Sequence, residues 1–331
     1  MSRFDGEIEV GRMTKAPLIA VVGSYATGLT MKVKRLPSRG ETLLGTGYRV
    51  DFGGKGSNQA VGCARLGAQV RFVAKVGKDA FGEMALGLYR DEGVDASGVK
   101  QVAEGPTGVG FIVVEEGTGN NCIVLDPGAN ELLTAEEVAG EAAGSQGCAV
   151  VLTQLEIPVA AAEAALRMGR SQGAITILNP APVRELPAAV LECVDILTPN
   201  LTEAKVLAGL SAESAIDAKE VARELIARGA KQVVVTLGEE GALIVSRDSA
   251  VRVPAVAVTA VDTTGAGDAF NAGLATALAS GASLAAAVEF AVVIGGLAVT
   301  REGVIPSLPT RAEVRAFYER GGKALPVWFQ G

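Results

Sequence analysis

The stretch VDTTGAGDAF, residues 261–270, places Asp262 and Asp268 on either side of a turn rich in Thr and Gly. The glycines allow a tight turn, and the apolar sequence that follows predicts a helix with Asp268 at its start. Three backbone amides would meet at the positive end of this helix and form an anion hole, those of Gly265, Ala266 and Gly267. A carboxylate beside a bound phosphate suggests a base that deprotonates a nucleophile, whereas the simpler interpretation makes Asp268 only a helix cap.

Histidine is absent from the 331 residues. Its absence removes Ser-His-Asp and Cys-His nucleophiles and the usual zinc sites, so any general base is expected to be a carboxylate. The formal net charge of −7 provides no broad cationic surface for a phosphate backbone, and we expect no nucleic-acid partner. The four cysteines contain no C-x-x-C pair and are expected to be buried free thiols.

The apolar segments are too short for a membrane protein. The N-terminal residues carry mixed charges, and the most apolar segment, residues 284–299, is shorter than a membrane span and contains Glu289. We therefore predict a cytoplasmic protein with no membrane partner. Residues 1–15 are expected to form an N-terminal extension, and residues 16–331 a single α/β domain.

Short β-rich runs alternate with helical patterns from about residue 16 onward, as in a parallel sheet covered by helices on both faces. Polar residues follow several predicted strands, which favours a site at the carboxyl edge of the sheet. Residues 29–52 and 107–126 interrupt this rhythm with strand alternation and Gly-rich turns. We interpret them as inserted antiparallel ribbons that form a β lid, with two surface hairpins of no function as the alternative.

The common nucleotide-binding templates do not fit. No G-x-G-x-x-G follows a strand, and the sequence GGKGSN, residues 53–58, lacks the upstream Gly and the K-[ST] of a Walker A loop. A Rossmann-type dehydrogenase is therefore disfavoured.

The motifs GGKGSNQA and VDTTGAGDAF, together with QLE, NPAP, TPNLTEA, TLGEEG and AVTREGVIPSLP, resemble those of the ribokinase-type sugar kinases, the phosphofructokinase B family. They stand in the family's order, and the likeness covers almost the whole chain, from about residue 17 to 319. The resemblance implies a three-layer α/β/α fold with a mostly parallel sheet and a small β-sheet lid. It also implies an ATP-dependent phosphotransferase that acts on a primary hydroxyl.

By this resemblance, Asp268 is the catalytic base, and Gly265, Ala266 and Gly267 form the anion hole for the γ-phosphoryl group. Asn200 and Glu203 match the family's N-x-x-E motif, in which Glu203 organises Mg²⁺, through water, and Asn200 contacts ATP. Without the resemblance, NLTEA reads as the capping box of a short helix.

The resemblance also implies binding residues for both substrates. The ATP site would include Thr236, Gly238, Gly241 and Gly267, although TLGEEG without the family is only a hairpin turn. The sugar site would include Gly54, Lys55, Asn58, Glu156 and Asp268, although a lone Lys in a Gly turn is usually solvated.

A monovalent-cation site is implied as well. Potassium-activated members use backbone carbonyls and a few side-chain oxygens, which here fall on Asp262, Thr264, Ala298, Arg301, Gly303 and Ser307. Asp262 thereby has a role distinct from that of Asp268.

One departure affects the substrate. After the first strand, members of the family have the sequence GS-x-N-x-D, in which Asn and Asp bind sugar hydroxyls. This chain has GSYATG instead, with Ala26 at the Asn position and Gly28 at the Asp position. We predict phosphorylation of a pentose or related small sugar, with ribose as the leading candidate. The alternatives are a deoxysugar or nucleoside kinase and, from another class, a non-catalytic sugar or nucleotide sensor. We also expect a homodimer formed through the lid.

Overall fold

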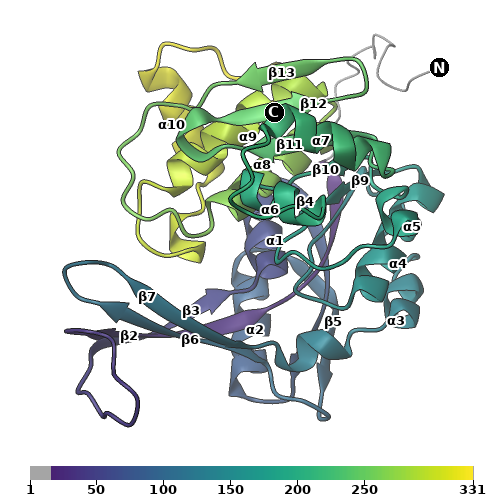
Figure 1. Cartoon of the computed structure of the whole chain (residues 1–331). Helices are drawn as coiled ribbons and strands as arrows, with labels where there is room; N and C mark the ends of the chain where they lie inside the picture. The colour runs from purple at the N-terminus through teal and green to yellow at the C-terminus, as the bar shows by residue number, and fades with distance from the viewer. Residues whose placement is uncertain (1–15, 331) are drawn as a thin grey trace.

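Two β-sheets organise the part of the chain that the computed structural model describes, residues 16–330 (Figure 1). The predicted extension at residues 1–15 lies outside the described residues. The larger sheet has the strand order β13-β12-β11-β10-β9-β8-β1-β4-β5, parallel from β5 to β11 and antiparallel at β12 and β13. Its strands are β1 (Leu18–Val22), β4 (Gln69–Gly77), β5 (Asp95–Val102), β8 (Val150–Thr153), β9 (Ile175–Leu178), β10 (Ile196–Leu197), β11 (Gln232–Thr236), β12 (Ala242–Val245) and β13 (Ala250–Val253).

Two separate cores show that helices cover both faces of this sheet. In β1, Ile19 and Val21 belong to one core and Ala20 and Val22 to the other, because successive side chains of a strand point to opposite faces. The first core contains residues of α1 (Lys55–Arg65), α2 (Ala80–Asp91), α8 (Ala266–Ala279), α9 (Leu284–Ala298) and α10 (Arg311–Arg320). The second contains residues of α3 (Ala135–Gly140), α4 (Val159–Gln172), α5 (Ala188–Leu191), α6 (Leu201–Leu207) and α7 (Ala218–Ala227). The predicted three-layer α/β/α architecture is confirmed.

Short 3₁₀ turns complete the body, namely η1 (Gly128–Leu132), η2 (Gly238–Glu240), η3 (Ile305–Ser307) and η4 (Val327–Phe329). The helix predicted to begin at Asp268 is α8, and α9 and α10 follow it. Within residues 16–330, none of the helices combines the length and apolar character that crossing a membrane requires. The prediction of four buried thiols is wrong at Cys122, which is exposed because β7 lies at an open edge of the smaller sheet.

The smaller sheet forms the predicted lid and projects to one side of the body (Figure 1). Its strand order is β3-β2-β6-β7, with β2 (Ala26–Val33), β3 (Thr46–Gly53), β6 (Gly108–Glu115) and β7 (Asn121–Asp126). Both inserted segments are antiparallel ribbons, and parallel pairing of β2 with β6 joins them. The lid therefore contains residues more than 70 positions apart in the sequence.

Candidate active site

Asp268 lies in the first turn of α8, at the carboxyl side of the central sheet. The residue that caps this helix is Gly265, which has a φ of 81° and makes no side-chain cap. The interpretation of Asp268 as a helix cap is therefore wrong. The side chain is instead buried, with Asp268 only 5% exposed.

Two amide side chains from α1 hold the Asp268 carboxylate. Asn58 Nδ2 donates to Oδ2 at 2.8 Å, and Gln59 Nε2 donates to Oδ1 at 2.9 Å. A carboxylate offers about four lone-pair positions, so these two bonds leave acceptor sites free. The arrangement fixes the direction of the carboxylate and still allows it to accept a proton.

Gln59 is itself oriented by residues that follow two neighbouring strands. Gln154, after β8, donates to Gln59 Oε1 at 2.5 Å, and Gln59 Nε2 also donates to Asn179 Oδ1, after β9, at 3.2 Å. These three residues were not predicted from the sequence, although they lie in the motifs GGKGSNQA, QLE and NPAP. For Gln154 and Asn179 the available signal was a polar side chain at a strand end, whereas Gln59 lies in α1.

Glu156 lies at the N-terminus of α1. Its Oε2 accepts hydrogen bonds from Ser24 Oγ at 2.5 Å and from the backbone amide of Lys55 at 2.8 Å. Gly54, which precedes the helix, has a φ of 87°, and a Cβ there would lie 2.6 Å from Tyr25 Cα. Only glycine therefore allows the turn that directs the start of α1 toward Glu156.

The side chain of Lys55 lies in the field of three carboxylates. Attraction from Asp268 raises the pKa of Lys55 above its usual value; burial opposes this, and Glu156 and Glu203 add to it. Lys55 is half-buried and not fully solvated. Burial raises the pKa of Glu203, against the opposing charge of Lys55.

Asn200 and Glu203 form the capping box that the motif NLTEA predicted. Asn200 Oδ1 accepts from the Glu203 amide at 2.8 Å, and Glu203 Oε2 accepts from the Asn200 amide at 2.9 Å. A backbone bridge joins Asn200 to Thr236 and so connects this helix to the end of β11. Among residues 16–330, no cluster of three or more His, Cys, Asp or Glu could hold a metal ion.

The turn before α8 differs in one detail from the expected anion hole. The amide of Ala266 already donates to the carbonyl of Thr263 at 3.2 Å. The amides of Gly265 and Gly267 have no acceptor among residues 16–330. Gly267 is exposed, and a Cβ built on it would meet no atom within 4 Å, so the space beside it is open.

A pocket of about 620 Å³ begins at this turn. Thr236, Gly238, Gly241 and Gly267, all predicted for ATP, line it. Apolar side chains that the sequence analysis did not identify complete its walls, among them Val256, Val258, Phe270, Val292 and Val299. Apolar walls with a few polar groups suit the flat ring of a nucleotide base.

The residues predicted for a monovalent cation lie on two adjoining loops, 261–264 and 298–307. The Asp262 carboxylate joins the loops because it accepts from the amides of Thr264 at 2.9 Å and Gly303 at 3.0 Å. The Val261 amide also donates to the carbonyl of Val299 at 2.7 Å. Within residues 16–330, four predicted carbonyl ligands accept no hydrogen bond, those of Asp262, Thr264, Arg301 and Gly303.

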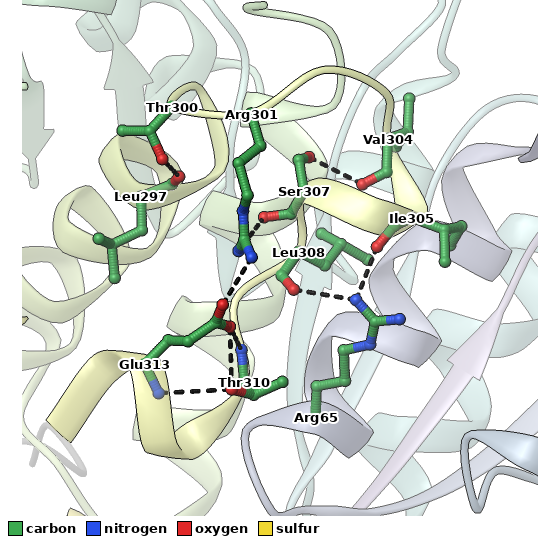
Figure 2. A network of polar contacts seen from close by, with 10 residues as sticks. All are labelled: Arg65, Leu297, Thr300, Arg301, Val304, Ile305, Ser307, Leu308, Thr310 and Glu313. Carbon is green, nitrogen blue, oxygen red and sulfur yellow. Dashed lines mark hydrogen bonds and ion pairs between the residues drawn. The ribbon is translucent and has the colours of Figure 1, made fainter. Parts of the chain in front are cut away.

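The remaining predicted ligands of this site already have partners (Figure 2). Arg301 donates to the carbonyl of Ser307 at 3.0 Å and pairs with Glu313 at 2.5 Å, and Ser307 Oγ donates to the carbonyl of Val304 at 2.8 Å. The carbonyl of Ala298 accepts a long bond of 3.5 Å from the Arg301 amide. The loop is thus braced by the protein itself.

Arg65 connects loop 298–307 to α1, the helix whose Asn58 and Gln59 side chains bond to the Asp268 carboxylate. It lies in the last turn of α1 and donates to the carbonyls of Ile305 at 2.7 Å and Leu308 at 3.0 Å (Figure 2). Its guanidinium also pairs with Glu92 at 2.5 Å. Since Asn58 and Gln59 lie on the same helix as Arg65, loop 298–307 and the Asp268 carboxylate are parts of one packed unit.

Known proteins are similar to this chain in both sequence and fold. A family model for pfkB family carbohydrate kinases matches residues 16–311. Ribokinase of Haemophilus influenzae is 36% identical over 301 residues, which are 91% of this chain and 98% of that protein. Deoxyribokinase of Salmonella typhi is 34% identical over 293 residues, 88% of this chain and 95% of that protein. The structure of Arabidopsis thaliana ribokinase complexed with ribose and ATP superposes with a TM-score of 0.82 at 31% identity, covering 91% of this chain and 98% of that one.

These matches extend over nearly the whole described chain, and they include proteins that act on different sugars. They therefore establish the ribokinase-like fold and the class of reaction without selecting a substrate. The chain belongs to the pfkB family of carbohydrate kinases and is an ATP-dependent kinase.

Proposed function

We propose that this kinase transfers the γ-phosphoryl group of ATP to the primary hydroxyl of a pentose or related small sugar, with ribose as the leading candidate. The observation that carries the proposal is the buried Asp268 carboxylate, held by Asn58 and Gln59 beside the open turn at Gly267. A base next to an anion-binding turn suits an attack by a hydroxyl on a phosphoryl group. The ribokinases among its relatives support a pentose.

In this mechanism Asp268 accepts the proton of the sugar hydroxyl as the hydroxyl oxygen bonds to the γ-phosphorus and the bond to ADP breaks. The amides of Gly265 and Gly267 donate to the phosphoryl oxygens, where negative charge must be stabilised. Ala266 contributes to the shape of the turn. Lys55, Asn58, Glu156 and the turn at Gly54 would orient the sugar, because all lie around the same end of α1.

Two ions complete the proposal. Mg²⁺ would lie near Glu203 and Asn200 and neutralise phosphate charge; their side chains suit it because Mg²⁺ keeps several waters and needs few protein ligands. One oxygen of Glu203 is left without a donor among residues 16–330. K⁺ would be held by the free carbonyls of loops 261–264 and 298–307. Its proposed effect is to hold the turn at Gly265 in the geometry that binds phosphate.

A coupled assay of ADP release tests this function. The panel contains ribose, 2-deoxyribose, other pentoses, hexoses and nucleosides, each with ATP and Mg²⁺. We expect the highest kcat/KM on a pentose. A best rate on 2-deoxyribose or a nucleoside would replace this substrate with a deoxysugar or nucleoside. ATP and sugar binding without ADP release by any member would indicate a sensor and refute catalysis.

A further inference from the structure

The lid carries a carboxylate beside position 28, where the resemblance to the family implies a sugar-contacting Asp. Gly28 on β2 occupies that position, and its register partner on the neighbouring strand β3 is Asp51. A Cβ built on Gly28 would lie 3.6 Å from the Cβ of Asp51. Paired residues of neighbouring strands point to the same face of a sheet. The carboxylate of this chain therefore lies on the same face of the lid as position 28, but on the neighbouring strand β3.

This face of the lid is directed toward the active-site loops. Arg49, two residues before Asp51 and on the same face, pairs with Glu302 at 3.4 Å, next to Gly303 of the cation loop. Strand β3 also packs against η3, and it leads directly through Gly53 and Gly54 into the start of α1. The face of the lid that carries position 51 thus adjoins the body.

The other polar residues near the departure are not available. Tyr25 is fully buried, and its hydroxyl shares a hydrogen bond of 3.1 Å with Thr27 Oγ1. Thr27 is also fully buried and, by strand alternation, points away from the face of Ala26 and Gly28. Neither residue can reach a ligand without unpacking the lid. On the face of Ala26 and Gly28, Asp51 is the carboxylate that lies directly beside position 28.

The Asp51 carboxylate has room and bonding capacity for a ligand. Its side chain is 33% exposed, and Oδ2 accepts a bond of 3.3 Å from Thr30 Oγ1 and pairs with Arg49 Nε at 3.2 Å. Oδ1 has no donor among residues 16–330. Gly110 of β6, the other register partner of Gly28, adds open space, since a Cβ there would meet nothing closer than 3.8 Å.

We propose that Asp51 binds a hydroxyl of the sugar and so replaces the contact absent at position 28. The inference rests on the proposed function and makes it more specific. The substrate is a sugar that presents a hydroxyl donor to the β3 side of the lid, so an analogue lacking that hydroxyl is discriminated against. Asp51 is thus a specificity-determining residue and takes no part in proton transfer.

Kinetics of Asp51→Asn on ribose, 2-deoxyribose, arabinose and xylose test the assignment. For the sugar that the wild type prefers, we expect KM to rise about 10- to 100-fold, since hydrogen bonds to charged groups are strong, with kcat nearly unchanged. The preference between that sugar and its analogue lacking the bound hydroxyl should shrink. Asp126→Asn is the matched control, because this lid carboxylate lies on the other face by register and should leave KM unchanged.

Two variants that move the carboxylate from position 51 to position 28 distinguish a loss of sugar binding from a loss of folding. Gly28 is not in the left-handed region, so Asp fits its backbone, and only the tip of Ile112, 3.3 Å from the added Cβ, must shift. The double variant Gly28→Asp with Asp51→Ala should recover most of the affinity that Asp51→Ala alone loses. Gly28→Asp alone brings two carboxylates together and should bind sugar more weakly than the wild type.

The outcomes are distinct. In one outcome the wild type turns over sugar while Asp51→Asn leaves KM unchanged for every accepted sugar. That result overturns the role of Asp51 and leaves the proposed function standing. Failure of the double variant to improve on Asp51→Ala also counts against it. No turnover of any sugar by the wild type overturns the proposed function and this inference with it.

Discussion

Asp268 shows how the chemistry of a single residue depends on its neighbours. In an exposed helix turn its carboxylate would be an ordinary surface charge. Here it is 5% exposed and receives two side-chain hydrogen bonds from α1, a helix about 210 residues earlier in the sequence. Lys55 adds a nearby positive charge. These contacts orient the carboxylate without using all of its acceptor positions.

We predict that Asp268→Asn lowers kcat by about 10²- to 10⁴-fold, the usual contribution of a positioned base. The KM for ATP should change little, since the base acts in the transition state and the nucleotide pocket is untouched. Steady-state kinetics with the preferred sugar provide the measurement, and the exposed Asp248→Asn is the control. A variant that retains more than about a tenth of the wild-type kcat would refute the assignment.

At the scale of elements, short loops are held by side chains that reach across them. Asp262 joins loops 261–264 and 298–307, and Arg65 joins the second loop to α1. Asp79 does the same at the base of the lid: it caps α2 through the Gly82 amide and accepts two bonds from Thr107, the residue before β6. Each of these residues couples two elements that the local sequence does not connect.

We predict that K⁺ raises activity above that in Na⁺ at equal ionic strength. The free carbonyls beside the proposed phosphate-binding turn suit a cation, and the cation would fix the geometry of that turn. The ratio of the two rates should fall in Asp262→Ala, because the loops lose their connection. Equal rates in the two salts for the wild type would remove the cation site from the proposal.

Asp79 should make the stability of the kinase depend on pH. Burial tends to raise the pKa of Asp79, but its bonds to Thr107 and Gly82 outweigh this and hold the pKa below its usual value. The folded state therefore binds this proton less tightly than the unfolded state. The stabilisation is complete above the usual carboxyl pKa of about 4 and is lost as the pH falls through the lowered value.

Urea unfolding of Asp79→Ala checks this expectation. At pH 7 the variant should lose about 1–2 kcal/mol of unfolding free energy, the usual value of a helix cap. The difference from wild type should shrink as the pH falls through the lowered pKa of Asp79, because the carboxyl group then becomes protonated in both states. A difference that stays constant or grows on acidification would contradict the assignment.

At the scale of the whole molecule, the lid leaves apolar surface uncovered. Phe111 and Val124 are register partners on one face and are 55% and 69% exposed. Strand β7 is exposed along its full length and forms an open edge of the sheet. Exposed apolar patches and open edges are commonly covered by a partner.

We therefore expect a homodimer in which two lids cover each other. Light scattering of the wild type should give twice the chain mass of 33.6 kDa. The double variant Phe111→Lys with Val124→Lys should give the mass of one chain, whereas the lid control Lys32→Glu should remain dimeric. A wild-type protein that is monomeric at assay concentrations would contradict this expectation.

Local patterns in the sequence determined the layered α/β fold, the lid segments, the helix after Gly267 and the capping box at Asn200, because each depends on residues close together in the chain. Family motifs supplied the candidate residues of the site. Several details lay beyond both sources: Gly265 caps α8, Ala266 uses its amide within the turn, and Cys122 is exposed. Only the tertiary structure decided them, since each depends on how the backbone closes or on which strand lies at an edge.

The pairing of distant side chains was decided in the same way. The residues Gln59, Asn179 and Asp51 are present in the sequence, but no local sequence pattern predicts that Gln59 bonds to Asp268 or that Asp51 lies opposite Gly28. Helix packing brings the first pair together, and strand register the second. A shift of one residue in that register would turn Asp51 to the other face of the lid, so its position depends on the whole sheet.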